Sequence, residues 1–283
     1  MINYALVVAA TLLFSLQFFF NQRFQQSYGT DLKASLVFSL YKSVVIIVIM
    51  VMIAGFKVKF TVFSLIMAAI YAAVGMLMSY YSLKAFSVAN LSVFSVFSML
   101  GGMILPFFLG VIFYDEPLTV FKILCCLLIV GAVLLNIRRG EKNKKALLYY
   151  FAVFVLNGMA GVISKIHQSS AKAHVDSTGF MIWSSIVTVV ICAVWLLVGY
   201  GRIPLIKGKS ILFVSGYGVF NGVGNLFLLI ALSVLPASVQ YPLVTGGVMV
   251  CSTVISTLRR EKLTVRDYAA TAIALLASIF IAI

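Results

Sequence analysis

Apolar residues fill the sequence in long runs, and short polar breaks separate each run from the next. A helix that crosses the hydrocarbon core of a membrane needs about 20 mostly apolar residues. Runs of that length recur along the whole chain, so the pattern predicts an all-α polytopic membrane protein. The ten predicted transmembrane helices cover residues 2–22, 33–54, 61–83, 91–114, 118–137, 146–166, 178–199, 210–232, 238–258 and 265–283.

The composition leaves no room for a second, soluble part. Hydrophobic residues make up 63% of the chain and charged residues 10%, against roughly 45–50% and 25% in ordinary soluble domains. The longest break, residues 136–145, is far shorter than the 50 or more residues of an independent domain. The function must therefore lie within the helical bundle. Because the first run lacks a preceding basic segment, we expect it to stay as a helix rather than be cleaved as a signal peptide.

The net charge of +14 would suggest nucleic acid as the partner of a soluble protein. Here the Lys and Arg residues lie in the breaks, where they set membrane orientation and contact lipid headgroups. We therefore expect the lipid bilayer, and no nucleic acid, as a partner. Most basic residues follow the first, third, fifth, seventh and ninth helices, including Arg138, Arg139, Lys142, Lys144, Lys145, Arg259 and Arg260. The positive-inside rule predicts a multi-pass inner-membrane protein with these loops in the cytoplasm and both termini outside.

The chain repeats itself about halfway along, which predicts one integral membrane domain of two repeats, residues 1–140 and 141–283. The matching residues lie 142 to 146 positions apart: Gln26-Ser27 with Gln168-Ser169, Ser43 with Ser185, Tyr71 with Tyr217, Gly101-Gly102 with Gly246-Gly247, and Glu116-x-Leu118-Thr119 with Glu261-x-Leu263-Thr264. Each half holds five predicted helices. Because five is odd, the second half enters the membrane from the opposite side, and such inverted repeats are typical of alternating-access carriers.

Two strings carry a family resemblance, AFSVANLSVFSVFSMLGGMILPFFLGVIFYDEPLT and ALSVLPASVQYPLVTGGVMVCSTVISTLRREKLT. Each combines a helix end, a Ser-rich link, a Gly-containing helix and an acidic residue before Leu-Thr. The pattern resembles the EamA-like branch of the drug/metabolite transporter superfamily. The resemblance implies a ten-helix transporter that exports amino acids, other metabolites, drugs or nucleotide-linked compounds. The halves differ at Pro242, which the first half lacks, and at Cys251, where the first half has Pro106.

The acidic residues stand at the predicted loops and helix ends, and none lies in the middle of a span. Proton-driven export of cations usually needs a carboxylate inside the membrane, since such a costly group is kept only for that use. The pattern therefore argues against a cationic drug antiporter. Glu116 and Glu261 precede Leu-Thr at the starts of the fifth and tenth helices, where a carboxylate is favoured by the partial positive charge of a helix N-terminus. We expect them to cap and orient those helices, and contact with the substrate is the alternative.

Lys42 is a basic residue well inside a predicted span, roughly 13 Å beyond its start at a rise of 1.5 Å per residue. Two interpretations stay open. The helix begins later than predicted and the side chain reaches cytoplasmic water along its stem, or the ammonium lines a cavity beside Tyr41 and binds an anionic group of the substrate.

Polar residues inside the spans form the wider set of candidates. Gln17 and Asn21, and likewise Asn221 and Asn225, are four residues apart, so each pair shares one helix face. A polar face in a membrane must turn toward protein or water. Interhelical hydrogen bonds would explain any one of these residues, but the set favours a cavity. The candidate substrate-binding residues are Gln17, Asn21, Tyr41, Lys42, Tyr80, Tyr81, Asn157, Trp183, Asn221, Asn225, Gln240 and Tyr241.

Other residues are candidates for moving parts. Arg23 and Lys165 end matching helices on opposite faces of the membrane, either as gate charges or as interfacial anchors. The Gly101-Gly102 and Gly246-Gly247 pairs lie mid-span and serve either close helix packing or a hinge. Pro236 and Pro242 bracket the start of the ninth helix, which predicts local unwinding near Gln240 and Tyr241.

No constellation of residues suggests catalysis or a cofactor. Cys125, Cys126, Cys192 and Cys251 lack metal-ligand spacing and are expected to be buried, so no metal site is predicted. His167 and His174 are expected in an exposed loop. We therefore expect no enzyme, and a carrier of a small polar metabolite that is neutral, zwitterionic or anionic. The family resemblance implies that the metabolite is exported. A lipid-linked substrate flippase of the same fold and a membrane accessory subunit are the alternatives, and a monomer or homodimer is left open.

Overall fold

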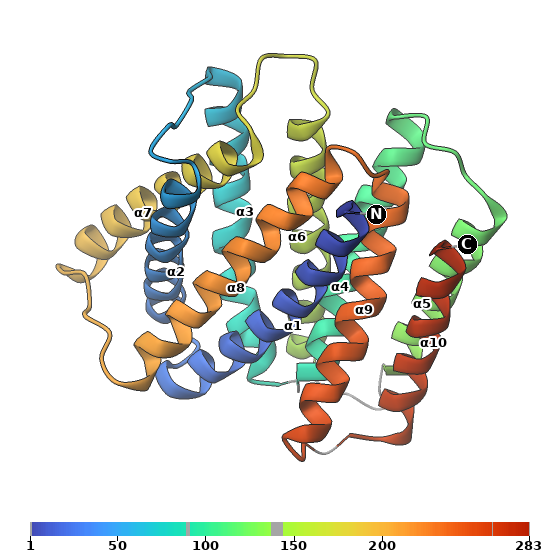
Figure 1. Ribbon diagram of the computed structural model, residues 1–283. Coiled ribbons are helices and arrows are strands. Elements are labelled where there is room, and N and C mark those ends of the chain that lie inside the picture. The colour runs from blue at the N-terminus through green and yellow to red at the C-terminus, as the bar shows by residue number, and fades with distance from the viewer. Residues whose placement is uncertain (1, 89–90, 137–143, 262, 283) are drawn as a thin grey trace.

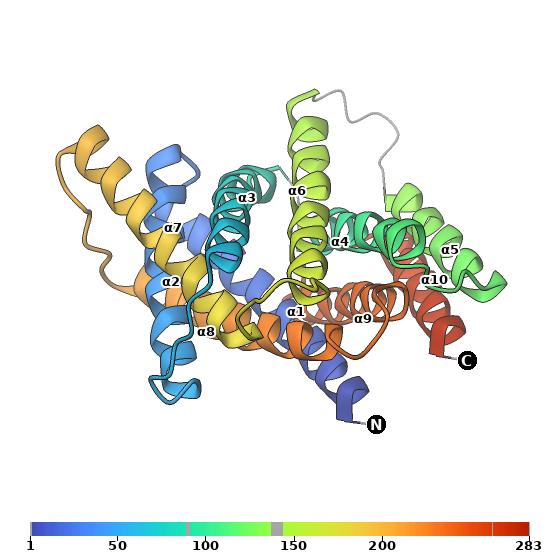
Figure 2. The same cartoon turned by 90° about the horizontal axis from the view of Figure 1, so that it is seen from above.

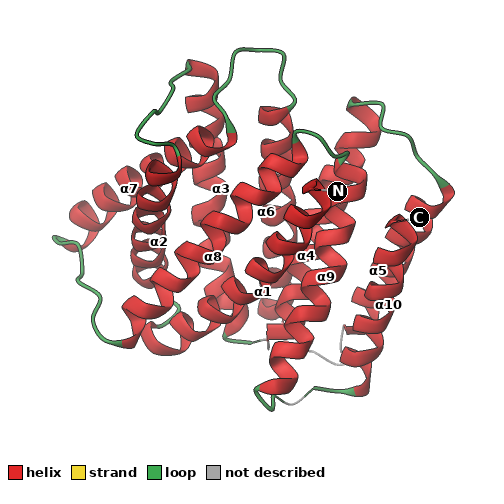
Figure 3. Cartoon of the chain, viewed as in Figure 1, coloured by secondary structure: helices red, strands yellow, loops and turns green. Residues whose placement is uncertain are grey.

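The computed structural model of the chain describes residues 2–88, 91–136, 144–261 and 263–282. Within those ranges every element of secondary structure is a helix (Figure 3). The helices are α1 (Ile2–Tyr28), α2 (Leu32–Ile53), α3 (Val62–Phe86), α4 (Leu91–Phe113), α5 (Val120–Asn136), α6 (Lys144–Gln168), α7 (Ser177–Tyr200), α8 (Lys209–Leu232), α9 (Ala237–Leu258) and α10 (Val265–Ala282).

The helices follow the predicted apolar runs closely, with one clear difference in α1. This helix ends at Tyr28 rather than near residue 22, so Arg23 lies inside it. The extra residues 23–28 are mostly polar, yet Phe24 among them is buried, as are Asn21 and Gln22 just before them, and packing holds this part of the chain helical. The expected boundary between the halves lies outside the described residues, together with Arg138, Arg139, Glu141 and Lys142.

Seven helical segments in the described part of the chain are long and apolar enough to cross a membrane. They are α1, α2, α3, residues 147–168 of α6, α7, α8 and α9. Shorter apolar stretches lie in α4 (Phe97–Phe113) and in α5 (Ile123–Ala132). These are the helices of a multi-pass membrane protein.

The exposure of the side chains is also typical of a membrane protein. Val198 and Leu205 are 84% and 79% exposed, whereas Gln17 and Gln240 are 6% and 0% exposed. A water-soluble protein of this size rarely leaves so much contiguous apolar surface. Apolar side chains that face outward and polar ones that face inward suit a bundle surrounded by lipid.

The packing order brings together helices that are far apart in the sequence (Figure 1). Helix α1 packs on α8 and α9, α3 on α6 and α7, α4 on α6 and α9, and α2 on α7 and α8. The pair α5 and α10 lies side by side at one edge, and α2 and α7 lie at the opposite edge (Figure 2). The centre of the bundle is therefore formed by helices from both ends of the sequence.

Two helices begin at a carboxylate that the sequence analysis did not single out as a cap. Asp31 accepts a hydrogen bond from the Ala34 N–H at 2.8 Å at the start of α2, and Asp176 accepts one from the Gly179 N–H at 2.9 Å at the start of α7. Such caps satisfy N–H groups that have no partner within the helix. The two caps stand at matching places, 145 residues apart.

The expected unwinding at the start of α9 does not occur. Pro236 is the N-cap, and the helix runs unbroken from Ala237 to Leu258 through Pro242. A proline inside a helix removes one backbone hydrogen bond, and the surrounding packing absorbs that loss here, since Gln240, Tyr241 and Pro242 are all buried. Helix α4 likewise continues through Pro106.

Gly101 is a point of close approach between α4 and α6. A Cβ atom added there would lie 1.8 Å from the backbone oxygen of Phe154. At Gly102 it would meet the Asn157 side chain at 2.6 Å, and at Gly247 the Thr11 side chain at 2.5 Å. In this conformation these glycines therefore serve close helix packing.

Substituting Gly101 should separate α4 from α6. We expect Gly101→Ala to destabilise the protein by about 1–3 kcal/mol or more, because the obstacle is backbone and cannot rotate away. Gly131→Ala in α5 is the matched control, since a Cβ there meets nothing within 4 Å and alanine favours the helix by about 1 kcal/mol. The melting temperatures of the purified proteins in detergent test this. Equal melting temperatures for the two variants would show that the α4–α6 contact is not tight.

Candidate functional site

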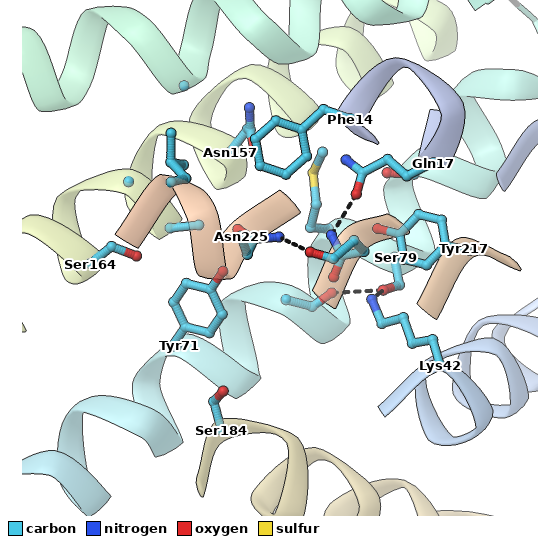
Figure 4. Close-up of a pocket in the computed structure, with 18 of the residues that line it drawn as sticks. Phe14, Gln17, Lys42, Tyr71, Ser79, Asn157, Ser164, Ser184, Tyr217 and Asn225 are labelled. Atoms are coloured by element: carbon cyan, nitrogen blue, oxygen red, sulfur yellow. Dashed lines mark hydrogen bonds between the residues drawn. The ribbon is translucent and has the colours of Figure 1, made fainter. Parts of the chain in front are cut away.

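A cavity of about 170 Å³ lies in the centre of the bundle (Figure 4). Residues of α1, α2, α3, α4, α6, α7, α8 and α9 line it, whereas α5 and α10 contribute none of the lining described. Its polar lining comprises Gln17, Asn21, Lys42, Ser43, Tyr71, Ser79, Ser82, Asn157, Ser164, Ser184, Ser185, Thr188, Tyr217, Asn221, Asn225, Tyr241 and Thr245. A cavity of about 150 Å³ can admit a benzene-sized molecule, so this one is large enough for a small metabolite.

Lys42 brings a positive charge to the cavity wall. Its helix begins at Leu32, so a later start of α2 does not explain its position. The Nζ atom donates a hydrogen bond to Ser79 Oγ at 2.6 Å (Figure 4). It also lies 5.3 Å from the ring centroids of both Phe38 and Tyr217. The negative faces of aromatic rings attract a cation, so the two rings stabilise an ammonium that has no carboxylate beside it among the described lining residues.

Side-chain amides line another part of the cavity. Asn221 Nδ2 donates to Gln17 Oε1 at 2.6 Å, which ties α8 to α1, and Asn225 Nδ2 donates to the Asn221 carbonyl at 2.8 Å (Figure 4). Asn157 Nδ2 donates to the Ser98 carbonyl at 2.6 Å. Asn21 is different, because its buried Oδ1 finds no hydrogen-bond donor among the described residues.

Hydroxyl groups join the helices on the remaining side of the cavity. Tyr241 of α9 donates to the Gly161 carbonyl of α6 at 3.2 Å, and Thr245 donates to the Met99 carbonyl of α4 at 3.1 Å. Hydrogen bonds of this kind fix helices that have no hydrophobic force between them in lipid. Polar groups thus serve two purposes at the cavity, holding the helices together and lining the space between them.

The structure brings only part of the predicted set together. Gln17, Asn21, Lys42, Asn157, Asn221, Asn225 and Tyr241 line the cavity. The others lie elsewhere. Tyr41 donates to the Pro204 carbonyl, Trp183 Nε1 donates to the Lys59 carbonyl, and Gln240 Nε2 donates to the Leu228 carbonyl. Tyr80 and Tyr81 pack against each other, and the Tyr81 ring also faces Tyr149.

The sequence analysis, which looked for polar residues four apart on one helix, missed several residues that line the cavity. Tyr71 and Tyr217 face the cavity from α3 and α8, and Ser43 and Ser185 face it from α2 and α7. The available signal was the repeat itself, because each pair recurs at a matching position in the two halves. Residues that match across the repeat and are also polar would have been the better predictor.

Known proteins give limited help with this site. Searches against protein-family models and against curated proteins find no match. A solved structure described only as "Crystal structure of protein" is similar, with a TM-score of 0.73 and 14% sequence identity. The similarity covers 98% of this chain and 94% of the other. It therefore shows a shared fold over almost the whole length, and the fold alone.

A buried ion pair lies beyond the cavity at the end where α6 finishes. Lys165 Nζ lies 3.0 Å from Glu116 Oε1, and both side chains are less than 10% exposed. The carboxylate also accepts hydrogen bonds from the N–H groups of Ala237 at 3.1 Å and Ser238 at 2.9 Å. Glu116 therefore caps α9, not the α5 helix that follows it in sequence. Tertiary packing places the start of α9 against the Glu116 carboxylate.

A second charged cluster lies at the opposite end, where α1 and α9 finish (Figure 1). Arg259 Nη1 lies 2.9 Å from Glu261 Oε1 and donates to Gln22 Oε1. The guanidinium groups of Arg23 and Arg259 lie 5.5 and 5.0 Å from the centroid of the Phe19 ring. Glu261 thus pairs with Arg259, and it is Asp267 that accepts the Thr264 N–H before α10. Arg23 and Lys165 each belong to a charged cluster, at opposite ends.

His167 is not the surface residue that the sequence suggests. It lies within α6 and is fully buried, its ring stacked on Phe180 with centroids 4.2 Å apart. Its Nε2 atom lies 2.9 Å from Ser64 Oγ. Because α6 continues to Gln168, His167 packs inward rather than joining the loop. His174 is exposed, as expected, and the described residues contain no metal-binding group of His, Cys, Asp or Glu.

The Glu116–Lys165 pair should make stability depend on pH. Burial raises the pKa of the Glu116 carboxyl, but hydrogen bonds from Ser238 and Lys165 outweigh it and hold the pKa below its ordinary value of 4.5. The stabilisation is complete above that ordinary value and is lost as the pH falls through the lower pKa of the folded protein. We expect the melting temperature to decrease when the pH is lowered below about 4.5. Glu116→Gln should make the melting temperature less dependent on pH in this range.

Removing the cation tests the same pair at neutral pH. We expect Lys165→Met to destabilise the protein by about 3 kcal/mol, because it leaves a buried charge uncompensated. Adding Glu116→Gln to Lys165→Met should recover part of the loss. Lys172→Met, at an exposed cation, should change stability by less than about 0.5 kcal/mol. Equal effects of the two lysine substitutions would show that the ion pair contributes nothing.

Proposed function

We propose that the chain is a secondary transporter that moves a small polar metabolite by alternating access. The observation that carries the proposal is the central cavity, whose polar lining contrasts with the apolar outer surface of the bundle. A polar interior within a membrane is costly and is kept where a solute or water must enter. Small-molecule sites are commonly concave and lie between helices of a bundle.

The packing order supports the proposal that the two halves are inverted repeats. The helix numbers of the second half are those of the first half plus five. If five is added to each helix number, counting from α1 again after α10, the α1–α8 contact becomes α6–α3, the α4–α6 contact becomes α9–α1, and the α2–α8 contact becomes α7–α3. All of these contacts occur. The contacts α2–α7, α4–α9 and α5–α10 map onto themselves. A pattern of this kind is what a two-fold axis in the membrane plane would produce.

Local geometry repeats in the same way. Asp115 and Arg260, each just before the Glu of the Glu-x-Leu-Thr string, have φ angles of 49° and 54°. Non-glycine residues seldom adopt this left-handed conformation, so its recurrence 145 residues apart supports a common origin of the two turns. In the proposed carrier these turns join the helices of the cavity to the outlying α5 and α10.

The two charged clusters are our candidates for gates. The Glu116–Lys165 pair joins the α4–α5 turn to α6 and α9, across the two halves. At the other end, the bond from Arg259 to Gln22 joins α9 to α1. Opening either end would require these contacts to break. Because the ion pair and two helix N–H groups act together at the Glu116 end, we propose that this end is the more firmly closed one here.

A direct transport assay tests the proposal. The purified protein is placed in liposomes loaded with a pooled metabolite extract, and mass spectrometry identifies the solutes that leave. We expect a restricted set of small polar metabolites to leave faster than from protein-free liposomes. Release of lipid-linked compounds into the opposite leaflet, without release of soluble metabolites, would favour a flippase. Absence of any movement would favour an accessory subunit and reject the transporter.

The orientation of the chain can be tested separately. The start of α8 and the end of α9 lie at the lower end in Figure 1. The basic residues Lys207, Lys209, Arg259 and Arg260 stand at or next to these two helix ends. We propose that this end faces the cytoplasm of an inner membrane. We expect a cysteine at position 207, in a variant without the native cysteines, to resist a membrane-impermeant thiol reagent in intact cells. A cysteine at position 57 should react. The reverse pattern would show that the chain is inserted the other way round.

A further inference from the structure

Lys42 is the only charged residue among the cavity-lining residues that the structure describes. Its one hydrogen bond to a described residue goes to Ser79 Oγ, although an ammonium group has three donors. Figure 4 shows the amine beside Ser79 and Tyr217 within the lining. The remaining N–H donors can therefore serve a ligand that carries acceptors and negative charge.

The charge of the cavity limits the charge of the ligand. A single ammonium neutralises one carboxylate, whereas a phosphate monoester carries about 1.5 to 2 negative charges at neutral pH. A dicarboxylate would likewise bring an unpaired charge into a site of low dielectric, which is costly. A ligand ammonium would find no carboxylate in the described lining and would be repelled by Lys42. A net charge of one negative unit fits best.

Asn21 sets a second requirement for the ligand, which is a hydrogen-bond donor. The residue is 3% exposed, and its Oδ1 atom has no donor among the described residues. A buried acceptor without a partner is unfavourable, so a rotation of the Asn21 side chain that turns Oδ1 toward the cavity and lets a ligand hydroxyl donate to it would be favoured. Asn21 lies one helical turn from Gln17, which bonds Asn221 of α8. Tyr217, whose ring faces the Lys42 ammonium, lies one turn from Asn221. Lys42 and Asn21 therefore lie on the same part of the cavity wall.

We infer that the substrate is a small monocarboxylate that carries at least one hydroxyl group. The carboxylate binds at Lys42 and Ser79, and a hydroxyl group donates to Asn21. The inference rests on the proposed transport function, because it names the substrate class of that same cavity. The size of the cavity, about 170 Å³, suits a compound of this kind.

A matched series of small compounds tests the inference by binding. The probes are glycerate, propionate without hydroxyl groups, glycerol without a carboxylate, serine with an ammonium in place of one hydroxyl, and glycerol 3-phosphate. We measure the dissociation constant of each from the thermal stabilisation of the purified protein in detergent. Glycerate should bind at least about tenfold more tightly than each of the others. Equal or tighter binding of propionate, serine, glycerol or the phosphate overturns the inference.

Substitutions at Lys42 and Asn21 test the two proposed contacts with the ligand separately. Lys42→Met should weaken glycerate binding at least about tenfold, while Lys33→Met, the same charge change on the same helix but outside the described cavity lining, should leave it unchanged. Asn21→Leu should bring the affinity for glycerate down to that for propionate and leave propionate unaffected. If Lys42→Met does not fold, Lys42→Gln replaces it. Unchanged glycerate binding in a folded Lys42 variant overturns the inference.

Transport measurements separate this inference from the proposed function. Counterflow of labelled glycerate in liposomes that depends on Lys42 supports both. Release of neutral or cationic metabolites from the pooled extract, without glycerate binding, overturns the substrate class and leaves the transporter standing. Lys42-dependent glycerate binding without movement of any solute supports the site chemistry and rejects the transporter.

Discussion

The arrangement of this protein follows from one constraint, which is that polar groups away from water must find partners inside the bundle. The outer surface is apolar, so the interior alone can satisfy the amides, hydroxyls and charges that the sequence places within its helices. Asn221 and Gln17 bond each other across α8 and α1, Asn157 bonds a carbonyl of α4, and Glu116 neutralises Lys165 while it caps α9. The same contacts set which helices lie side by side, and so determine where the cavity forms.

Helix packing at the cavity depends on residues without side chains as much as on polar ones. Gly101 lets α4 approach the backbone of α6, and Gly161 and Gly218 stand where an added Cβ would meet Pro106 and Val45 closely. These contacts join the first half of the chain to the second. Helices α5 and α10 pair with each other at the edge, outside the described cavity lining. The polar interior is thus held by contacts across the halves, which are the contacts that a carrier must rearrange.

Much of the fold could be read from the sequence, because apolar run length determines where a membrane helix lies. Apart from the longer α1, the helix bounds lie close to the predicted runs, and seven helical segments of the described chain are long and apolar enough to span a membrane. Tertiary contacts were less predictable. Glu116 caps α9 rather than α5, His167 is buried against Phe180, and α9 passes through Pro242 without unwinding. In each case a residue from a distant part of the sequence, or packing around the residue, outweighed the local rule. Lys42 could be found because a charge inside an apolar run is rare, whereas Tyr71 and Tyr217 resemble ordinary interior aromatic residues.

In the proposed carrier, the cavity lining determines how a substrate would be held through an alternating-access cycle. Ser43 and Ser185 match across the repeat, but Lys42 matches Ser184, and all four residues line the cavity. A pair of inverted halves would exchange equivalent environments as the protein reorients. Among the described lining residues of the second half the positive charge has no counterpart, so in the proposed carrier it would stay on α2 whichever end is open. A substrate anchored by its negative group would therefore keep the same wall throughout the cycle, and only its exposure to the two sides would change.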